Sequence, residues 1–153
     1  MDTDSPSSLE STPALWNPNA AACWCLVFTP VFGMFLHARN AESLGRLAEA
    51  KANRIWLYVA ITFLAVTLFT IFIPRFPPGI VRLCGLGILL GWYFSVAKKQ
   101  VQYVKETWQD QYPRKTWGKP ILIAIGGLVA YFVIAIILGV INAVVFGRIT
   151  SGN

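Results

Sequence analysis

The side chains that could carry out chemistry lie outside the apolar runs of this 153-residue chain. No Asp or Glu falls within such a run, and the only His lies where the first run meets the following loop; the acids are Asp2, Asp4, Glu10, Glu42, Glu49, Glu106 and Asp110. A proton-coupled carrier needs a titratable group inside the membrane, and this chain offers none there. The only histidine, His37, has no cysteine or acid at metal-ligand spacing, so we expect an interfacial side chain. There is also no zinc-protease helix and no phosphate-binding glycine loop. We therefore predict that the protein is not an enzyme and holds no cofactor and no metal ion.

The three cysteines do not form a disulfide framework. Cys23 and Cys25 are two positions apart, so on a helix they point to nearly opposite faces, and Cys84 lies in a different apolar run. We interpret them as small apolar thiols.

Small residues recur every four positions on two of the apolar runs. Such rows let helix backbones approach closely, which is how helices associate in lipid. The candidates for helix packing or partner binding are Gly87 and Gly91 on one run, and Ala135, Gly139, Ala143 and Gly147 on the last. We expect them to join helices of this chain more than to drive oligomerisation. Asn142, on the same run as the second row, is predicted to hydrogen-bond to another helix.

The longest uncharged run indicates that these residues lie in lipid. Ile121 to Phe146 has no charged residue, and at about 1.5 Å per residue it is roughly 39 Å long, more than the ~30 Å of a bilayer's hydrocarbon core. Apolar residues make up 56% of the chain and charged residues only 13%, about half of the charged share that is usual in soluble domains. We predict an all-α integral membrane helical bundle, with a single membrane-embedded domain over residues 19–148.

Four spans are predicted, over residues 20–37, 55–74, 80–97 and 121–146. The first is short and carries Pro30 near its middle and Gly33 just after. It therefore fits either a fourth span or a re-entrant segment beside three spans. We expect it to cross.

The basic residues predict which loops face the cytoplasm. The loops over residues 38–54 and 98–119 carry Arg39, Arg46, Lys51, Arg54, Lys98, Lys99, Lys105, Arg114, Lys115 and Lys119. Loops rich in Lys and Arg stay cytoplasmic, which places the turn at residues 75–79 outside. Residues 1–18 carry acids and no Lys or Arg, and we predict a disordered acidic tail. With four spans both termini lie outside. The net charge of +6 suits anionic lipid headgroups, and we predict no binding to nucleic acid.

Local patterns add detail at the ends of the spans. Ala97, Val101, Val104 and Trp108 fall at helical spacing, so we expect the third helix to continue to about Trp108. In the first basic loop, Leu44, Leu47 and Ala48 form a weaker helical stripe, with Glu42 and Arg46 spaced for an i,i+4 pair. Asn19 is placed to cap the first helix. Aromatic rings near the span ends, Trp92 among them, are expected to anchor at the headgroup level.

One N-terminal stretch resembles a group of small bacterial inner-membrane proteins. The similarity is carried by Trp16-Asn17-Pro18-Asn19-Ala20-Ala21-Ala22-Cys23-Trp24, by Phe28-Thr29-Pro30-Val31-Phe32-Gly33 and by Leu36-His37-Ala38-Arg39-Asn40. It covers about 30 residues and departs from the group at Cys25 and Ala41, where Ser and Trp are usual. Some proteins of this kind are encoded beside secreted toxins and act as immunity proteins. The resemblance implies a multi-pass protein of a bacterial inner membrane.

Three functions follow as hypotheses. The leading one is a non-enzymatic immunity protein that binds a membrane-inserting toxin protein within the bilayer. The second is a small transporter or channel subunit, with Asn142, Thr62, Thr67 and Thr70 lining its path. The third is a scaffold or assembly subunit of a membrane complex. The sequence leaves the partner, any ligand and the oligomeric state open.

Overall fold

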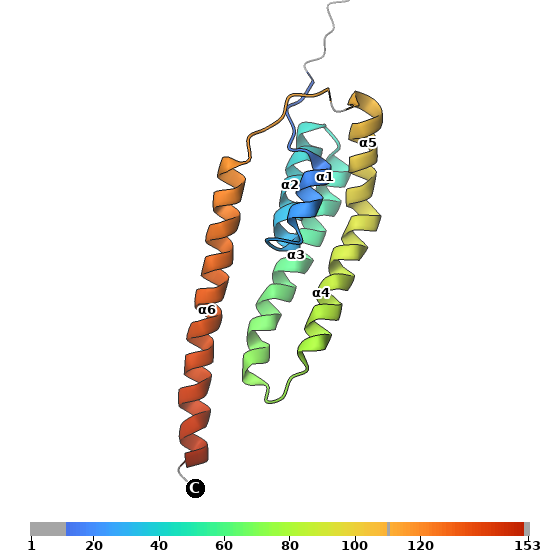
Figure 1. Cartoon of the computed structure of the whole chain (residues 1–153). Helices are drawn as coiled ribbons and strands as arrows, with labels where there is room; N and C mark the ends of the chain where they lie inside the picture. The colour runs from blue at the N-terminus through green and yellow to red at the C-terminus, as the bar shows by residue number, and fades with distance from the viewer. Residues whose placement is uncertain (1–11, 110, 152–153) are drawn as a thin grey trace, which may run out of the picture.

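The computed structural model describes residues 12–109 and 111–151, and within this part the chain is all-helical (Figure 1). Its elements are α1 (Pro18–Trp24), α2 (Pro30–Ser43), α3 (Leu47–Phe69), the short 3-10 helix η1 (Thr70–Phe72), α4 (Pro78–Trp92), the π-helical stretch η2 (Tyr93–Ala97), α5 (Lys98–Trp108) and α6 (Gly118–Ser151). Residues 1–11 of the predicted acidic tail lie outside the described residues, and no side chain beyond Val145 is described.

Among the residues that the structure describes, three helices are long and apolar enough to cross a membrane. They cover Leu47–Phe72, Pro78–Trp108 and Gly118–Val145, and they contain the predicted spans at 55–74, 80–97 and 121–146 almost completely. The prediction of a membrane protein built from apolar helices is therefore confirmed. The fourth predicted span, over residues 20–37, is not confirmed.

In place of a fourth long helix, residues 18–43 form an antiparallel hairpin of two short helices. His37 Nε2 lies 3.0 Å from the carbonyl oxygen of Pro18, and Gly33 lies against Ala21, so α2 runs back along α1. The chain reverses over residues 25–29, about halfway along the long helices (Figure 1). Pro30 makes the break possible because it has no N–H for a continuing helix and suits the first turn of a new one. Both ends of this run therefore lie at one end of the bundle.

Two local predictions about this region are wrong. Asn17, not Asn19, caps α1, because its side chain accepts hydrogen bonds from the backbone N–H groups of Asn19 and Ala20. The first basic loop is not one helix, since Gly45 takes a left-handed φ of +68° and separates α2 from α3.

The ion pairs of this region are consistent with the turn at Gly45 between α2 and α3. Glu42 pairs with Arg39 and Arg54, while Arg46 pairs with Glu49 at 2.5 Å and not with Glu42. Glu42 therefore joins α2 to α3 across the turn at Gly45.

The third helix continues beyond the apolar run as predicted. The α4, η2 and α5 segments follow one another without a break, and α5 ends at Trp108, where Gln109 takes a left-handed φ of +45°. The turn between α3 and α4 lies at the opposite end of the molecule and contains Arg75 at a φ of +58°.

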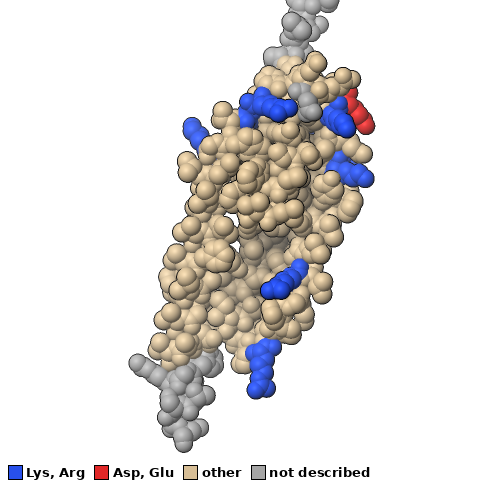
Figure 2. Space-filling view, viewed as in Figure 1, with Lys and Arg blue, Asp and Glu red and all other residues tan. Residues whose placement is uncertain are grey.

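The tightly packed part of the protein lies at the end from which α1 starts. The largest core cluster joins Cys25, Met34, Ala60, Trp92 and Val96. By contrast, α6 lies along one side of the bundle, is hydrogen-bonded to the end of α3, and runs toward the opposite end (Figure 1). In Figure 2 most of the basic side chains gather at the tightly packed end, above a broad uncharged surface.

Candidate functional site

In the described part of the chain, four polar side chains are fully buried, all at the tightly packed end of the bundle. They are His37 and Asn40 on α2, Asn53 on α3 and Gln100 on α5. Together with Trp92 they form what we call the buried polar layer. Because a buried polar group costs free energy unless it is hydrogen-bonded, the partners of each member decide what the layer does.

His37 lies at the centre of the buried polar layer. Its Nε2 is 3.0 Å from the carbonyl oxygen of Pro18, which can only accept, so Nε2 carries the proton. Its ring meets Trp92 edge-on, with centroids 5.1 Å apart. Burial lowers the pKa of His37 from 6.5 to about 4, so the ring is neutral at pH 7. The prediction of an interfacial histidine is therefore wrong.

Gln100 joins α5 to this centre. Its Nε2 donates to the backbone carbonyl of His37 at 3.0 Å. Within the buried polar layer, Gln100 Oε1 and His37 Nδ1 make no hydrogen bond of good geometry, although the Gln100 side chain is near enough to raise the pKa of His37 slightly against the effect of burial. The layer thus contains an acceptor oxygen and an unprotonated ring nitrogen and no acid, which suits a structural role better than proton transfer.

Trp92 connects α4 to α3 through Asn53. The indole Nε1 donates to Asn53 Oδ1 at 2.8 Å, and Asn53 Nδ2 donates to the carbonyl of Glu49 at 3.0 Å. Trp92 has no exposed surface, so the prediction that it anchors at the headgroup level is wrong. Trp92 is the last residue of α4 and directly precedes the π-helical stretch η2.

Asn40 fastens the start of the described chain. Its Nδ2 donates to the carbonyl of Trp16 at 2.7 Å, and its Oδ1 accepts from the Trp16 N–H at 3.1 Å. Leu15 is fully buried and pairs through its backbone with Pro113 and Lys115. This part of the predicted disordered tail is therefore held against the loop that precedes α6.

The buried polar layer could not be found from charges or known motifs, because its members are uncharged and belong to no such motif. A usable signal existed in the alanines one turn away from three of the four residues. Ala41 follows His37, Ala50 precedes Asn53, and Ala97 precedes Gln100. A small residue beside an uncharged polar one marks a helix face that approaches a neighbour closely.

The predicted packing residues fall into different surroundings. A Cβ on Gly91 would lie 2.9 Å from the Trp56 ring, so Gly91 is where α4 meets α3. A Cβ on Gly87 or Gly139 would meet no heavy atom of another element within 4 Å. Ala135 is half-buried and Ala143 is exposed. Gly147 belongs to the part of α6 whose side chains are not described.

Three of the four polar side chains proposed to line a path are bonded within the chain, whereas the fourth, Thr62, is exposed. Asn142 Nδ2 donates to the carbonyl of Ile71 at 2.8 Å. Thr67 Oγ1 lies 2.8 Å from Tyr131 Oη and donates to the carbonyl of Leu64 at 2.7 Å. Thr70 donates to the carbonyl of Thr67 at 2.6 Å. These groups join α6 to the end of α3 and leave few polar atoms for a transported solute.

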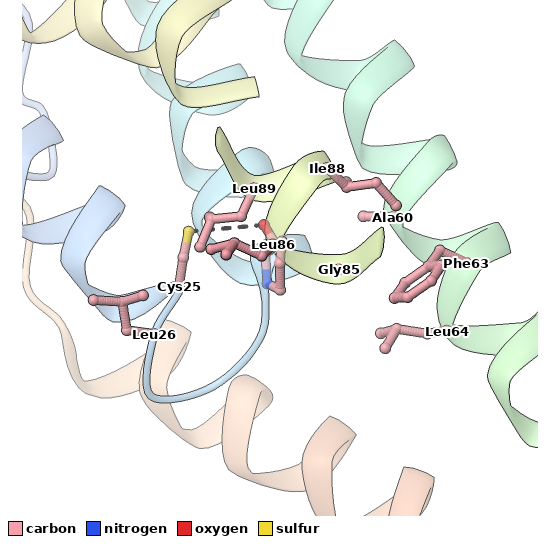
Figure 3. A pocket seen from close by; sticks show the side chains of 10 residues that line it. Cys25, Leu26, Ala60, Phe63, Leu64, Gly85, Leu86, Ile88 and Leu89 are labelled. Carbon is pink, nitrogen blue, oxygen red and sulfur yellow. Dashed lines mark hydrogen bonds between the residues drawn. The ribbon is translucent and has the colours of Figure 1, made fainter. Parts of the chain in front are cut away.

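A small apolar pocket of about 280 Å³ lies beside the turn of the α1–α2 hairpin. Figure 3 shows Cys25 and Leu26 facing residues of α4, with Ala60 and Phe63 of α3 beyond them. The thiol of Cys25 contacts the carbonyl of Pro30 at 3.9 Å. Burial raises the pKa of this thiol to about 12, which makes it unreactive at neutral pH. The pocket therefore carries no nucleophile.

No protein-family model, curated protein or solved structure matches this chain. Any functional conclusion therefore depends on the geometry of the molecule itself.

Proposed function

We propose that this protein acts without catalysis, by binding a transmembrane helix of another protein along the half of α6 that contains Ala135, Gly139 and Ala143. The observation that supports the proposal is the open space beside Gly139, where an added Cβ would meet no atom of another element within 4 Å. Small residues allow close approach of helices in lipid, and here no helix of this chain occupies the position.

The attachment of α6 to the rest of the chain is consistent with such a role. Within the described residues, the hydrogen bonds that hold it are those from Tyr131 to Thr67 and from Asn142 to Ile71, both near the end of α3. None of the apolar window of its span is buried inside the molecule. A helix that is held at a few points leaves most of its surface available for a partner.

The specific form of the proposal is an immunity protein that neutralises a membrane-inserting toxin. A toxin of this class must place a helix in the bilayer, and an open row of small residues on α6 can bind that helix. The alternative of a transporter or channel has weaker support, because Asn142, Thr67 and Thr70 are bonded within the chain.

We further propose an orientation in a bacterial inner membrane. The basic connections, and with them both ends of the α1–α2 hairpin, face the cytoplasm. The hairpin is then a re-entrant segment beside three spans, and the end of α6 lies outside. This orientation replaces the expectation that both termini are outside.

Cysteine accessibility tests the orientation. One cysteine at a time is introduced at Ala14, Glu106 or Gly79 in a Cys23→Ala/Cys84→Ala background that keeps only the buried Cys25. Whole cells are then labelled with a membrane-impermeant maleimide. Gly79 is suited to this because a Cβ there meets no neighbour within 4 Å. We expect labelling at position 79 alone. Labelling at position 14 would show instead that the first run crosses.

Co-expression tests the function. Cells that lack this protein are challenged with the product of the adjacent gene and rescued with wild-type protein, Gly139→Leu or Gly87→Leu. Both glycines face open space, but only Gly139 lies on α6, so we expect Gly139→Leu alone to lose protection. Unchanged sensitivity of the deletion strain, or equal loss in both variants, contradicts the proposal. A photo-crosslinker at Ala143 then reports the partner's mass, and a second copy of this chain would favour the scaffold hypothesis.

A further inference from the structure

An apolar groove of about 390 Å³ lies between α2, α3 and the first half of α6. Its volume is within the ~300–1,000 Å³ of pockets that bind small molecules. The lining carries no charged residue, and each helix contributes apolar side chains or glycine: Val31 and Phe35, Leu57 and Ile61, and Ile123 and Gly127. This groove lies on a different part of α6 from the row at Ala135, Gly139 and Ala143.

Each of the three helices that line the groove carries a basic residue about one helical turn from one of its lining residues. On α2, Arg39 follows Phe35 by four residues, and its guanidinium carbon lies 5.9 Å from the centre of the Phe35 ring. On α3, Arg54 precedes Leu57 by three residues, and on α6, Lys119 precedes Ile123 by four. Residues three or four apart share a helix face. The three cations lie toward the same end, because α2 finishes, α3 starts and α6 starts at the end of the bundle shown uppermost in Figure 1.

Near this end of the groove, several basic side chains lie around a single acidic one, Glu42. Arg39 and Arg54 both pair with the single carboxylate of Glu42. Lys115 joins the group through a hydrogen bond of 2.9 Å to Ser43, one turn beyond Arg39 on α2. Arg39, Arg54 and Lys115 against Glu42 leave a surplus of two positive charges, and Lys119 is not included in this count. Burial, and then the nearby Arg39, lower the pKa of Lys115, as expected where two cations face each other.

We propose that this groove binds one acyl chain of an anionic phospholipid, whose phosphate lies against Arg39, Arg54 and Lys115. Along each wall of the groove, the residues change from apolar to cationic toward the same end of the bundle. A phospholipid changes in the same order, from its apolar acyl chain to its charged phosphate. The bilayer supplies this ligand at high concentration beside the open groove. The binding is independent of the partner proposed for α6 and would hold the first half of that helix at a fixed distance from α2.

The test uses the full chain purified in mild detergent and native mass spectrometry. Wild-type protein is mixed with phosphatidylglycerol or phosphatidylcholine of identical chains, and bound lipid is counted. We expect selective retention of phosphatidylglycerol. Arg39→Gln/Arg54→Gln should weaken it by about 30-fold, roughly fivefold for each cation near a headgroup. The matched control is Arg75→Gln/Arg82→Gln, which removes two arginines from the opposite end and should change nothing.

A second pair of variants tests the groove itself. Gly127→Leu places a side chain where the acyl chain would lie, whereas Gly87→Leu adds the same side chain on α4, away from the groove; neither glycine has a neighbour within 4 Å of an added Cβ. We expect Gly127→Leu alone to lose bound lipid, with both variants remaining monodisperse. Equal retention of the two lipids, unchanged binding in Arg39→Gln/Arg54→Gln, or full binding by Gly127→Leu would overturn the proposal. A partner helix found in the groove by crosslinking from Leu128 would also overturn it.

Discussion

A methyl group added at Gly33 tests the α1–α2 hairpin, which is the main departure of the structure from a chain of four spans. A Cβ on Gly33 would lie 2.0 Å from Cys25 Sγ and 2.8 Å from the carbonyl oxygen of Ala21. Both distances are far below the ~3.5–4.0 Å at which non-bonded carbon atoms attract each other. The thiol could rotate away, but the oxygen belongs to the backbone of α1. Gly33→Ala therefore forces the two helices apart.

The size of the effect follows from two opposing contributions. Overpacking of a close-packed site costs about 1–3 kcal/mol, while replacing a helical glycine by alanine stabilises by ~0.5–1 kcal/mol. We expect Gly33→Ala to lower the free energy of unfolding by about 1–2 kcal/mol. In one continuous helix over residues 20–37, only the second contribution would apply and the change would have the opposite sign.

The assay is unfolding in mild detergent by added SDS, followed by circular dichroism. Gly87→Ala is the matched control, because its Cβ would meet no neighbour within 4 Å and the variant should gain ~0.5–1 kcal/mol. Adding Cys25→Ala to Gly33→Ala should recover part of the loss, since the contact with Sγ disappears and the contact with Ala21 remains. If Gly33→Ala is stabilised as much as Gly87→Ala, the packing of the hairpin as described is wrong.

Three further predictions concern the buried polar layer and the cysteines. Because the pKa of His37 is about 4 when folded and near 6.5 when unfolded, only the unfolded chain gains a proton as the pH falls from 7 toward 4. Stability should therefore fall by up to about 3 kcal/mol over that range, and detergent unfolding of His37→Gln should lack this dependence; an identical pH profile would contradict it. Trp92→Phe and Asn53→Ala each leave a buried polar atom without a partner, so each should cost ~1–3 kcal/mol. Their double mutant should lose less than the sum, and strict additivity would argue against the hydrogen bond. A maleimide should label exposed Cys23 in the folded protein and Cys25 only after unfolding, because burial raises the pKa of Cys25 to about 12. Peptide mass spectrometry measures the labelling of each cysteine, and equal labelling of the two in the folded protein would refute this prediction.

The long apolar runs could be recognised from the sequence because the physical requirement is local. A stretch such as residues 121–146 has no charge and exceeds the bilayer thickness, so its composition alone predicts a span. The extension of the third helix to Trp108 was also predictable, because the apolar positions keep helical spacing. Both predictions depend on neighbouring residues in the chain.

The hairpin and the buried polar layer could not be predicted in the same way, because they depend on contacts between distant residues. Pro30 and Gly33 suit a kinked span as well as a reversal of the chain. The decisive contacts are those of His37 with Pro18 and of Gln100 with His37, across 19 and 63 positions. A single histidine without charged neighbours carries no sign of such partners in its local sequence.

Leu15 and Trp16 are synthesised long before the residues to which they are hydrogen-bonded. The backbone of Leu15 is enclosed by hydrogen bonds to Pro113 and Lys115, and the indole of Trp16 donates to the carbonyl of Thr116, 100 positions later. At ~5–20 residues per second, a ribosome needs roughly 5–20 s to produce the intervening chain. Leu15 and Trp16 therefore gain these partners only after α3, α4 and α5 have been synthesised. A chain that stops before residue 113 lacks all of these hydrogen bonds at the start of its N-terminal hairpin.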